Sequence, residues 1–282
     1  MQRHGAVSKS LLMPQRETAY AKINLALHVR RRRDDGYHEL ETLFAFVDAG
    51  DVVSAEPAAQ DELRTVGEFA VQLTNPFSNI VGSALKALPH GLGWAVTLEK
   101  NLPVAAGLGG GSADAGALFR MVEAQFGLPD DWQARAAKLG ADVPACVRSV
   151  TCFGRGTGTD LTEVESDLTG TAVLLVNPRL PLSTGPVFGG WDGIDRGPLP
   201  EGPVSAIARA GRNDLEPSAI ALCPAIADVL AALCHTNPIL ARMSGSGATC
   251  FAPYETSEQR DAGAMAIKSA HPEWWQLAGN LR

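Results

Sequence analysis

The chain has 282 residues, of which 45% are hydrophobic and 20% charged, as is usual for a globular protein of one large or two ordinary domains. Its net charge of −7 argues against a general binder of nucleic acid or membrane surfaces, and no apolar run is long enough to span a membrane. Five scattered cysteines without metal-ligand spacing indicate free thiols, and no signal peptide is recognisable, so we expect a cytoplasmic protein.

A long β-strand is expected near the N-terminus. Residues 1–17 read as a polar lead-in, and from Thr18 to Val29 apolar and polar side chains then alternate. This period of two places Lys22 and Asn24 side by side on one face. They belong either to a solvent face or to a polar site. The arginine run 30–33 is interpreted as a solvated strand end, with a secondary role in binding an anionic substrate.

An Asp-Gly turn at positions 35 and 36 leads into Tyr37 and His38. By composition these two are ordinary half-buried residues. An aromatic ring beside a histidine can, however, also stack on a base or sugar and hydrogen-bond it. The elements expected next are strands over 40–47, 51–56 and 69–74, a helix over 79–88 and a strand over 95–99.

A glycine-rich loop between that last strand and a helix is the most informative stretch. Glycines 107 and 109–111 fill four of five positions, and Ser112 is a good N-cap for a helix that runs to Phe126 and ends at Gly127. The start of a helix offers unpaired N–H groups and a partial positive charge, and glycines let a phosphate approach the backbone. The stretch predicts a polyphosphate site; the alternative is a flexible turn that caps the helix.

The loop differs from the two best-known phosphate-binding motifs. No Lys-Ser or Lys-Thr pair follows its last glycine, as a Walker A loop requires. Ser112 stands where a Rossmann fingerprint has its third glycine. Neither motif therefore accounts for the loop.

The segment 140–144, Gly-Ala-Asp-Val-Pro, follows a short helix expected over 130–139. Pro144 disfavours a helical Val143 and suits the first turn of a new helix. Asp142 is then either the N-cap of this helix or a carboxylate that projects into a cleft.

The second half of the chain is expected to form its own domain. A strand over 150–153 runs into a loop with three glycines, and a boundary there gives domains of 18–156 and 157–282. Its expected elements are a strand over 172–176, a helix or turn over 182–188, a surface loop over 192–204, a helical region over 212–233 with Asn213 and Asp214 as caps, a strand over 248–252, a helix over 257–270 and a strand over 274–278. The Gly-Ser turn at 244–248 is either a plain hairpin or a place of close approach by a backbone or ligand. The alternation favours an α+β sandwich.

Three motifs in this order resemble those of the GHMP superfamily of small-molecule kinases, which includes galactokinase and the homoserine, mevalonate and phosphomevalonate kinases. They are the strand around 21–25, the loop 103–113 and the turn 244–248. Two more segments, 35–44 and 140–144, are similar to those of the kinases that act on 4-diphosphocytidyl-2-C-methyl-D-erythritol. The resemblance spans residues from about 18 to 280.

The resemblance implies a GHMP kinase fold, with two α/β sandwich domains and the active site in the cleft between them. It implies ATP and Mg²⁺ as cofactors and Lys22 and Asp142 as the catalytic pair. The implied ATP-binding residues are Pro103, Val104, Ala105, Ala106, Gly107, Leu108, Gly109, Gly110, Gly111, Ser112 and Ala113, with Ser112 as a Mg²⁺ contact. The pair Ala105–Ala106 stands where relatives often carry glycine, and we expect only a stiffer loop.

The implied substrate-binding residues are Asn24, Tyr37, His38, Thr184, Phe188 and Gly245. Asn24 would hold the substrate, Tyr37 would stack on the cytosine ring and His38 would hydrogen-bond it. Thr184 and Phe188 would close over the cytidine, and Gly245 would support the substrate from the second domain together with Gly247.

The function implied by the resemblance is ATP-dependent phosphorylation of the 2-hydroxyl of 4-diphosphocytidyl-2-C-methyl-D-erythritol, in the non-mevalonate route to isoprenoid precursors. Partners would be small molecules, without nucleic acid or membrane, and the protein would be a monomer or homodimer. The alternatives are another GHMP kinase, acting on mevalonate or homoserine, and a nucleotide-binding module without turnover. Tyr37 and His38 favour the cytidine substrate, because a small acid gives their rings nothing to stack on.

Overall fold

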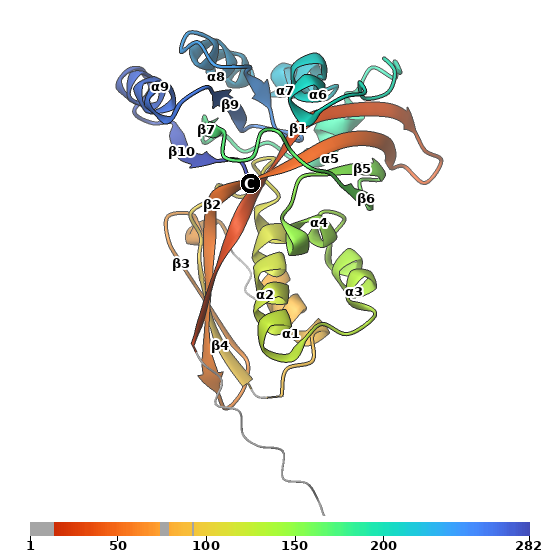
Figure 1. Ribbon diagram of the computed structural model, residues 1–282, viewed down its shortest axis with the longest axis vertical. Coiled ribbons are helices and arrows are strands. Elements are labelled where there is room, and N and C mark those ends of the chain that lie inside the picture. The colour runs from red at the N-terminus through yellow and green to blue at the C-terminus, as the bar shows by residue number, and fades with distance from the viewer. Residues whose placement is uncertain (1–13, 74–78, 92) are drawn as a thin grey trace, which may run out of the picture.

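The structure, a computed structural model, describes residues 14–73, 79–91 and 93–282. Its two parts lie one above the other along the long axis, and two long strands run from one part into the other (Figure 1). Of the expected lead-in, residues 1–13 lie outside the described part, and the first strand already begins at Gln15.

These two long strands, β1 (Gln15–Arg32) and β2 (His38–Ala58), form an antiparallel hairpin. The expected alternation is confirmed in β1, where Ile23 and Leu25 enter an apolar core. Lys22 and Asn24, on the other face, are also buried, so a solvent face is excluded. The register shifts between Tyr20 and Lys22, and such irregularities bend a strand and redirect its side chains.

The first sheet has the order β3-β4-β2-β5-β6, with β1 paired to β2. Its remaining strands are β3 (Glu62–Val66), β4 (Gly93–Glu99), β5 (Cys152–Gly156) and β6 (Asp160–Glu163). Only β3 and β4 pair in parallel among these strands of the described chain. The expected domain boundary after residue 156 falls between the paired strands β5 and β6, and the division into domains stays a prediction.

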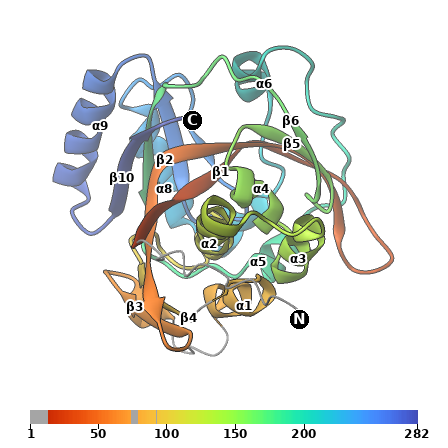
Figure 2. The ribbon, with the colours of Figure 1, turned by 60° about the horizontal axis from the view of Figure 1, so that its bottom comes forward.

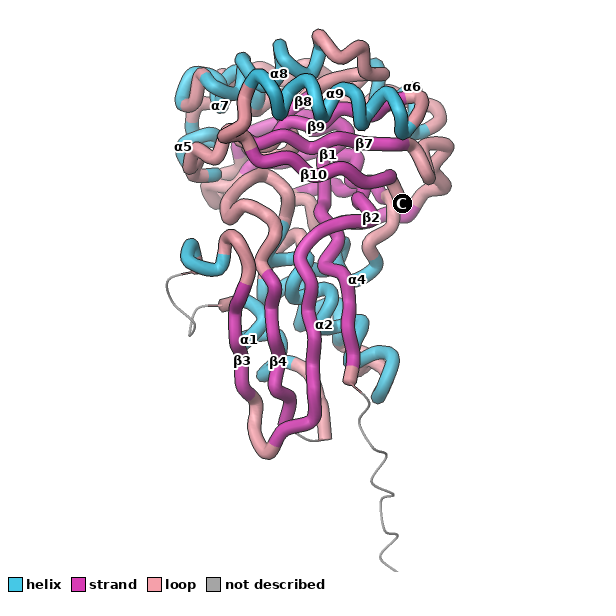
Figure 3. Tube along the Cα trace, turned by 90° about the vertical axis from the view of Figure 1, so that its left-hand side faces the viewer, coloured by secondary structure: helices cyan, strands magenta, loops and turns pink. Residues whose placement is uncertain are grey.

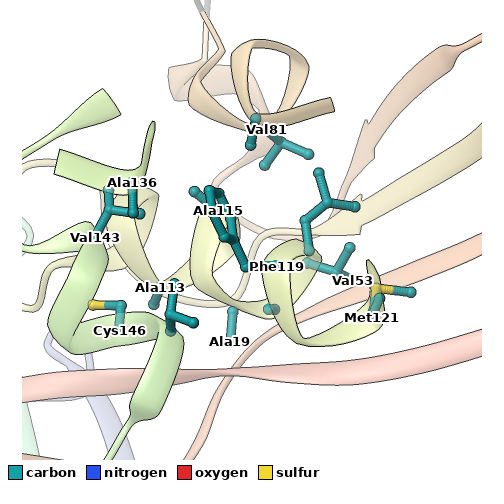
Figure 4. Packing of buried hydrophobic residues seen from close by; sticks show 14 of the residues in the cluster. Ala19, Val53, Val81, Ala113, Ala115, Phe119, Met121, Ala136, Val143 and Cys146 are labelled. Atoms are coloured by element: carbon teal, nitrogen blue, oxygen red, sulfur yellow. The ribbon is translucent and has the colours of Figure 1, made fainter. Parts of the chain in front are cut away.

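This part also has four helices: α1 (Ile80–Ala87), α2 (Gly110–Phe126), α3 (Trp132–Leu139) and α4 (Val143–Arg148). Helix α2 lies at the centre, with α1 and α4 beside it and the long strands against it, and α3 packs on α1 and α4 (Figure 2). Its alanine-rich sequence leaves room for neighbours on several sides. Ala113, Ala115 and Phe119 pack among residues of α1, α4 and β2, such as Val81, Cys146 and Val53 (Figure 4). This core fixes the start of α2 relative to the long strands.

The second part has a four-stranded sheet of order β10-β7-β9-β8, with α8 and α9 packed against it (Figure 3). Its strands are β7 (Ala172–Asn177), β8 (Arg242–Met243), β9 (Cys250–Tyr254) and β10 (Trp275–Asn280). Its helices are α5 (Thr184–Gly189), α6 (Val204–Ala210), α7 (Glu216–Leu222), α8 (Ala225–Cys234) and α9 (Ser257–Ala270). The expected α+β fold with two sandwich-like parts is confirmed.

One apolar cluster joins the two parts. It contains Ile23 and Leu43 from the long hairpin, Val173 and Phe251 from the second sheet, and Leu108 from the glycine loop. The loop is therefore anchored where the parts meet. None of the helices in the described ranges combines the length and the apolar character needed to cross a membrane.

The expected strand over 69–74 is wrong. Residues 70–72 form a short 3-10 turn, η1 (Ala70–Gln72), and Thr74 lies outside the described residues. The Phe69 N–H donates a hydrogen bond to Lys100 O, and the chain there turns away from the direction of β3. The sequence also gave no indication of β3, β6, β8 or α6, which are short or mostly polar.

Candidate active site

A cleft of about 1030 Å³ lies between the two parts and gathers residues from both. Every residue predicted for the site lines it except Leu108 and Ala113, which are buried in the apolar cores. The wall also includes residues that sequence analysis did not select, among them Arg32, Asn79, Lys100 and Asp114. We describe the cleft from the glycine loop outward.

Helix α2 begins at Gly110, two residues before the expected start, so the prediction of Ser112 as N-cap is wrong. Gly109 holds the N-cap position instead, in the left-handed region with φ of 61°, and its carbonyl accepts from Ala113 N at 2.8 Å. No side chain caps this end. Because Gly110, Gly111 and Ser112 line the cleft, the first turn presents its N–H groups and its positive dipole end there.

Lys22 lies against the glycine loop. Its backbone N–H donates to Leu108 O at 2.9 Å, which ties β1 to the loop. Its ammonium donates to Asn24 Oδ1 at 3.0 Å and lies 3.2 Å from Asp142 Oδ2. The expected placement of Lys22 beside Asn24 is therefore confirmed, and both side chains face the cleft.

Asp142 occupies the N-cap position of α4 but makes no capping hydrogen bond. Its carboxylate instead pairs with the Lys22 ammonium, while one third of the side chain stays exposed, against 5% for Lys22. Of the two interpretations left open, the carboxylate that projects into the cleft is the one observed. The pair combines a buried positive charge with an accessible hydrogen-bond acceptor.

The Gly-Ser turn of the second part interlocks with the glycine loop. Ser244 Oγ accepts from Asn24 N at 3.2 Å and donates to Gly107 O at 2.8 Å. The backbones are so close that a Cβ added to Gly107 would lie 2.2 Å from Ser244 O, so only glycine fits there. The turn is thus a place of close backbone approach and joins β1, the loop and the second sheet at one hydroxyl.

Asn213 and Asp214, expected as helix caps, mainly hold other elements in place. Asn213 Nδ2 donates to Met243 O at 2.9 Å and Gly245 O at 2.8 Å, which fixes the Gly-Ser turn. Asp214 Oδ2 accepts from Val29 N at 2.8 Å and so binds β1. The N-cap of α7 is Leu215, whose N–H donates to Asn213 Oδ1, and Glu216 N donates to the Asn213 carbonyl.

The opposite end of the cleft is aromatic. Tyr37 is 66% exposed, whereas His38 is buried with its ring 5.1 Å from Phe188 and 5.7 Å from Trp191. Burial, and next the charge of Arg32, lower the pKa of His38, so its ring is neutral at pH 7. His38 Nε2 has no hydrogen-bond partner in the structure. An open aromatic face and an unpaired ring nitrogen suit a planar polar ring.

Thr184 and Arg32 also line the cleft. Thr184, the first residue of α5, shares a hydrogen bond of 3.1 Å with Ser246 of the Gly-Ser turn. The arginine run is only in part a solvated strand end, since Arg30 pairs with Glu41 and Asp195 and Arg32 lines the cleft.

A buried ionic group lies under the first turn of α2, and sequence analysis missed it. The ammonium of Lys100, which follows β4, bonds Asp51 of β2 and lies 2.9 Å from Asp114 Oδ2 of α2. A lysine after a strand usually faces solvent, so no local pattern marked this one. Asp114, an acidic residue among the alanines at the start of the helix 110–126, was the one available signal.

Comparison of the sequence with known proteins shows the family to which the chain belongs. The family model described as GHMP kinases N terminal domain matches residues 79–150, and the one described as GHMP kinases C terminal matches 201–273. The 4-diphosphocytidyl-2-C-methyl-D-erythritol kinase of Novosphingobium aromaticivorans is 67% identical over 96% of this chain and 94% of its own. The chain belongs to the 4-diphosphocytidyl-2-C-methyl-D-erythritol kinase family of GHMP kinases.

Other members of this kinase family extend the agreement. The enzyme of Erythrobacter litoralis is 64% identical over 94% of this chain and 99% of its own. A crystal structure of a 4-(cytidine 5'-diphospho)-2C-methyl-D-erythritol kinase is 32% identical, with a TM-score of 0.79 over 95% of this chain and 99% of that one. Homoserine kinase from Cytophaga hutchinsonii, 17% identical with a TM-score of 0.69 over 99% and 98% of the two chains, shares the fold. The predicted family and fold are confirmed.

Proposed function

We propose that this protein transfers the γ-phosphoryl group of ATP to the 2-hydroxyl of 4-diphosphocytidyl-2-C-methyl-D-erythritol. The products are the 2-phosphate and ADP, and the reaction belongs to the methylerythritol phosphate route to isoprenoid precursors. One observation carries the proposal. The Lys22–Asp142 pair lies in a single cleft between a glycine loop that suits phosphates and an aromatic end that suits a base, in a member of this kinase family.

The loop from Pro103 to Ala113 would bind the ATP phosphates through the uncapped first turn of α2. Helix starts bind anions through free N–H groups and the dipole end. Leu108 and Ala113 would act through the core, since their side chains are buried, and the rest of the loop lines the cleft.

Phosphoryl transfer passes through a loose transition state, so positioning and charge stabilisation dominate its catalysis. Asp142 would accept or orient the proton of the attacking hydroxyl, because its carboxylate is the accessible acceptor of the pair. Lys22 would hold Asp142 in place and set a fixed positive charge beside the transferring group. Asn24, bonded to Lys22, would position the substrate.

The proposed reaction would also use a magnesium ion. In the described residues no three His, Cys, Asp or Glu side chains come together as a metal site. Mg²⁺ needs few protein ligands when nucleotide phosphates are present. The Ser112 hydroxyl, on the first turn of α2, would contact the ion. When bound, the ion would neutralise charge on the phosphate oxygens.

At the other end, Tyr37 would stack on the cytosine and His38 would hydrogen-bond it through the unpaired Nε2. Phe188 and Thr184 would close over the cytidine, and Gly245 would support the substrate from the turn that Asn213 holds. A cytoplasmic location and a monomeric or homodimeric state stay predictions.

The test is Mg²⁺-dependent release of ADP from ATP. We would offer 4-diphosphocytidyl-2-C-methyl-D-erythritol, mevalonate and homoserine separately to the wild type and to Tyr37→Ala and His38→Ala. Turnover with the cytidine substrate alone, with KM for that substrate raised about tenfold or more in both variants, is the expected result.

Other results separate the alternatives. Turnover with mevalonate or homoserine would keep the kinase assignment and refute the cytidine substrate. ATP binding without ADP release from any of the three would favour a nucleotide-binding module.

A further inference from the structure

Thr42 of β2 has no assigned role in the reaction proposed above. Its side chain lines the cleft, although it is only 1% exposed. Thr42 and Phe44 point to the same face of β2, because side chains two positions apart in a strand share a face, and Phe44 lies opposite Asn24. The Lys22 ammonium lies 4.8 Å from the centre of the Phe44 ring. Thr42 therefore belongs to the layer of side chains that contacts the two polar residues of β1.

The hydrogen bonds of the Thr42 hydroxyl have a fixed direction. Its Oγ1 donates to Ala26 O at 2.7 Å. A threonine hydroxyl has one hydrogen, so the same oxygen can only accept from Asn24 Nδ2, which is also 2.7 Å away. The amide nitrogen of Asn24 must therefore face Thr42, and the amide oxygen must face the other way.

The oxygen of the Asn24 amide faces the Lys22 ammonium, which donates to Asn24 Oδ1 at 3.0 Å. The same ammonium lies 3.2 Å from Asp142 Oδ2. Two acceptors thus hold the ammonium, one neutral and one charged. In the reversed amide orientation an NH₂ group would face the buried ammonium, and two donors without an acceptor between them are unfavourable there.

Packing against β5 sets the orientation of the Thr42 side chain. Gly154 of β5 pairs with Thr42, and a Cβ added to Gly154 would lie 3.0 Å from Thr42 Cγ2 and 2.7 Å from Phe44 Cε2. The threonine methyl group thus occupies the space over the glycine. Because a β-branched side chain is stiff at χ1, this placement directs the hydroxyl toward β1. Valine would keep this packing and lose only the hydroxyl.

We propose that Thr42 is a positioning residue, whose hydroxyl orients the Asn24 amide so that the amide oxygen holds the Lys22 ammonium beside Asp142. The inference rests on the proposed function only in taking Lys22 and Asp142 as the pair that acts in phosphoryl transfer. Without the hydroxyl, the Asn24 amide is free to reverse. Lys22 then loses one of the two acceptors that fix its position.

Hydrogen exchange of the Asn24 side-chain amide, followed by NMR on protein labelled at its asparagine side chains, tests the hydrogen bond without turnover. The signal is assigned by its absence in Asn24→Ala. In the wild type the Nδ2 protons should exchange much more slowly than those of the exposed Asn237. Thr42→Val should speed this exchange about fivefold or more, whereas Thr42→Ser, which keeps the hydroxyl, should stay within about twofold of the wild type. If wild-type Asn24 exchanges as fast as Asn237, or if Thr42→Val exchanges like the wild type, the proposal is wrong.

Steady-state kinetics of ADP release tests the positioning role. Thr42→Val should lower kcat about tenfold to a hundredfold and leave KM for ATP within about twofold, because a displaced Lys22 slows transfer without changing the glycine loop. Thr42→Ser should restore most of kcat. Thr162→Val, which changes an exposed threonine of β6, should behave like the wild type.

A double variant shows whether Thr42 acts through Asn24. When Asn24→Ala is already present, Thr42→Val should cause little further loss of kcat, because residues that act through one another do not contribute additively. An equal loss with and without Asn24 would overturn the proposal. Absence of ADP release from the wild type would refute the proposed function, whereas the exchange result would still decide whether Thr42 holds Asn24.

Discussion

Lys22 Nζ lies 3.2 Å from Asp142 Oδ2, although one residue comes from the first strand and the other from the start of α4. The two are brought together by the glycine loop, since Leu108 O accepts the Lys22 N–H and a Cβ added to Gly109 would lie 3.1 Å from Lys22 Cε. The loop therefore places the pair as well as lining the cleft in which we propose that the phosphates bind. Changes in the loop and in the pair should affect the same step.

Replacing either member of this pair should remove turnover with little effect on folding. We expect Asp142→Asn to lower kcat about a hundredfold to ten-thousandfold, the range for loss of a general base, with KM for ATP changed little. Lys22→Met should lower kcat by a similar factor. Steady-state kinetics of ADP release provides the measurement.

The double variant tests whether the two residues act as a unit. Groups that act together give effects that do not add. The double variant should be about as slow as the slower single one, with thermal unfolding as the control for folding. If the two losses multiply, Lys22 and Asp142 contribute separately and the paired role is wrong.

Ser244→Ala should weaken nucleotide binding through the loop. Its hydroxyl bonds Gly107 O and Asn24 N, and removing it leaves two groups without their partner, at a cost of about 1–3 kcal/mol. We expect a lower free energy of unfolding and a raised KM for ATP. Ser205→Ala, which removes a hydroxyl bonded to surface Asp167, serves as the control and should leave KM unchanged. An unchanged KM in Ser244→Ala would show that the interlock does not position the loop.

Ala105→Gly should stabilise the loop or leave its stability unchanged. Ala105 has φ of 54°, in the left-handed region that costs an L-residue about 1–2 kcal/mol, partly offset by the greater entropy that glycine has in the unfolded chain. Ala106→Gly is the matched control: its methyl group is buried and its φ is not positive, so we expect a loss of about 1 kcal/mol. Chemical denaturation measures both. A larger loss in Ala105→Gly than in Ala106→Gly would contradict the strain.

Acidification should destabilise the protein through His28. Its Nδ1 bonds Gly197 O at 3.2 Å and its Nε2 accepts from Arg212 N at 3.3 Å, so the buried ring is neutral. Burial, and next Arg212, lower the pKa of His28 below 6.5. The unfolded chain then binds a proton that the folded one does not, and the free energy of unfolding falls as pH drops below 6.5, by about 1.4 kcal/mol per pH unit until the folded pKa is reached.

Urea denaturation between pH 7.5 and 5 measures this slope. We expect His28→Ala to be less stable at pH 7.5 and to show a smaller loss of stability on acidification. His235→Ala changes an exposed histidine and should keep the wild-type slope. An unchanged slope in His28→Ala would mean that other groups set the acid sensitivity.

Local patterns predicted much of this site. Alternation in β1 placed Lys22 beside Asn24, and the glycines between strand and helix marked a loop that lines the cleft at a helix start; phosphate binding there stays a prediction. These features are local because strand periodicity and helix starts depend on residues close together in the chain. The pairing of Lys22 with Asp142 was implied only by the family resemblance.

The errors lie where distant contacts override local preference. Ser112 has a good capping side chain, but Gly109 can adopt the left-handed conformation and starts the helix earlier. Asn213 and Asp214 look like caps, yet their side chains also bond Met243 O, Gly245 O and Val29 N in other elements. Lys100 gives no local signal, because its partners Asp51 and Asp114 are set by packing.

The interlock at Ser244 has a consequence for how the enzyme comes into being on the ribosome. The glycine loop and Lys22 are synthesised early, but the hydroxyl that bonds Gly107 O and Asn24 N arrives only when most of the chain has been made. Contacts between residues so far apart in sequence form slowly, because the intervening chain must first be ordered. A growing chain thus holds Lys22 and the glycine loop for most of its synthesis before the Gly-Ser turn can close on them.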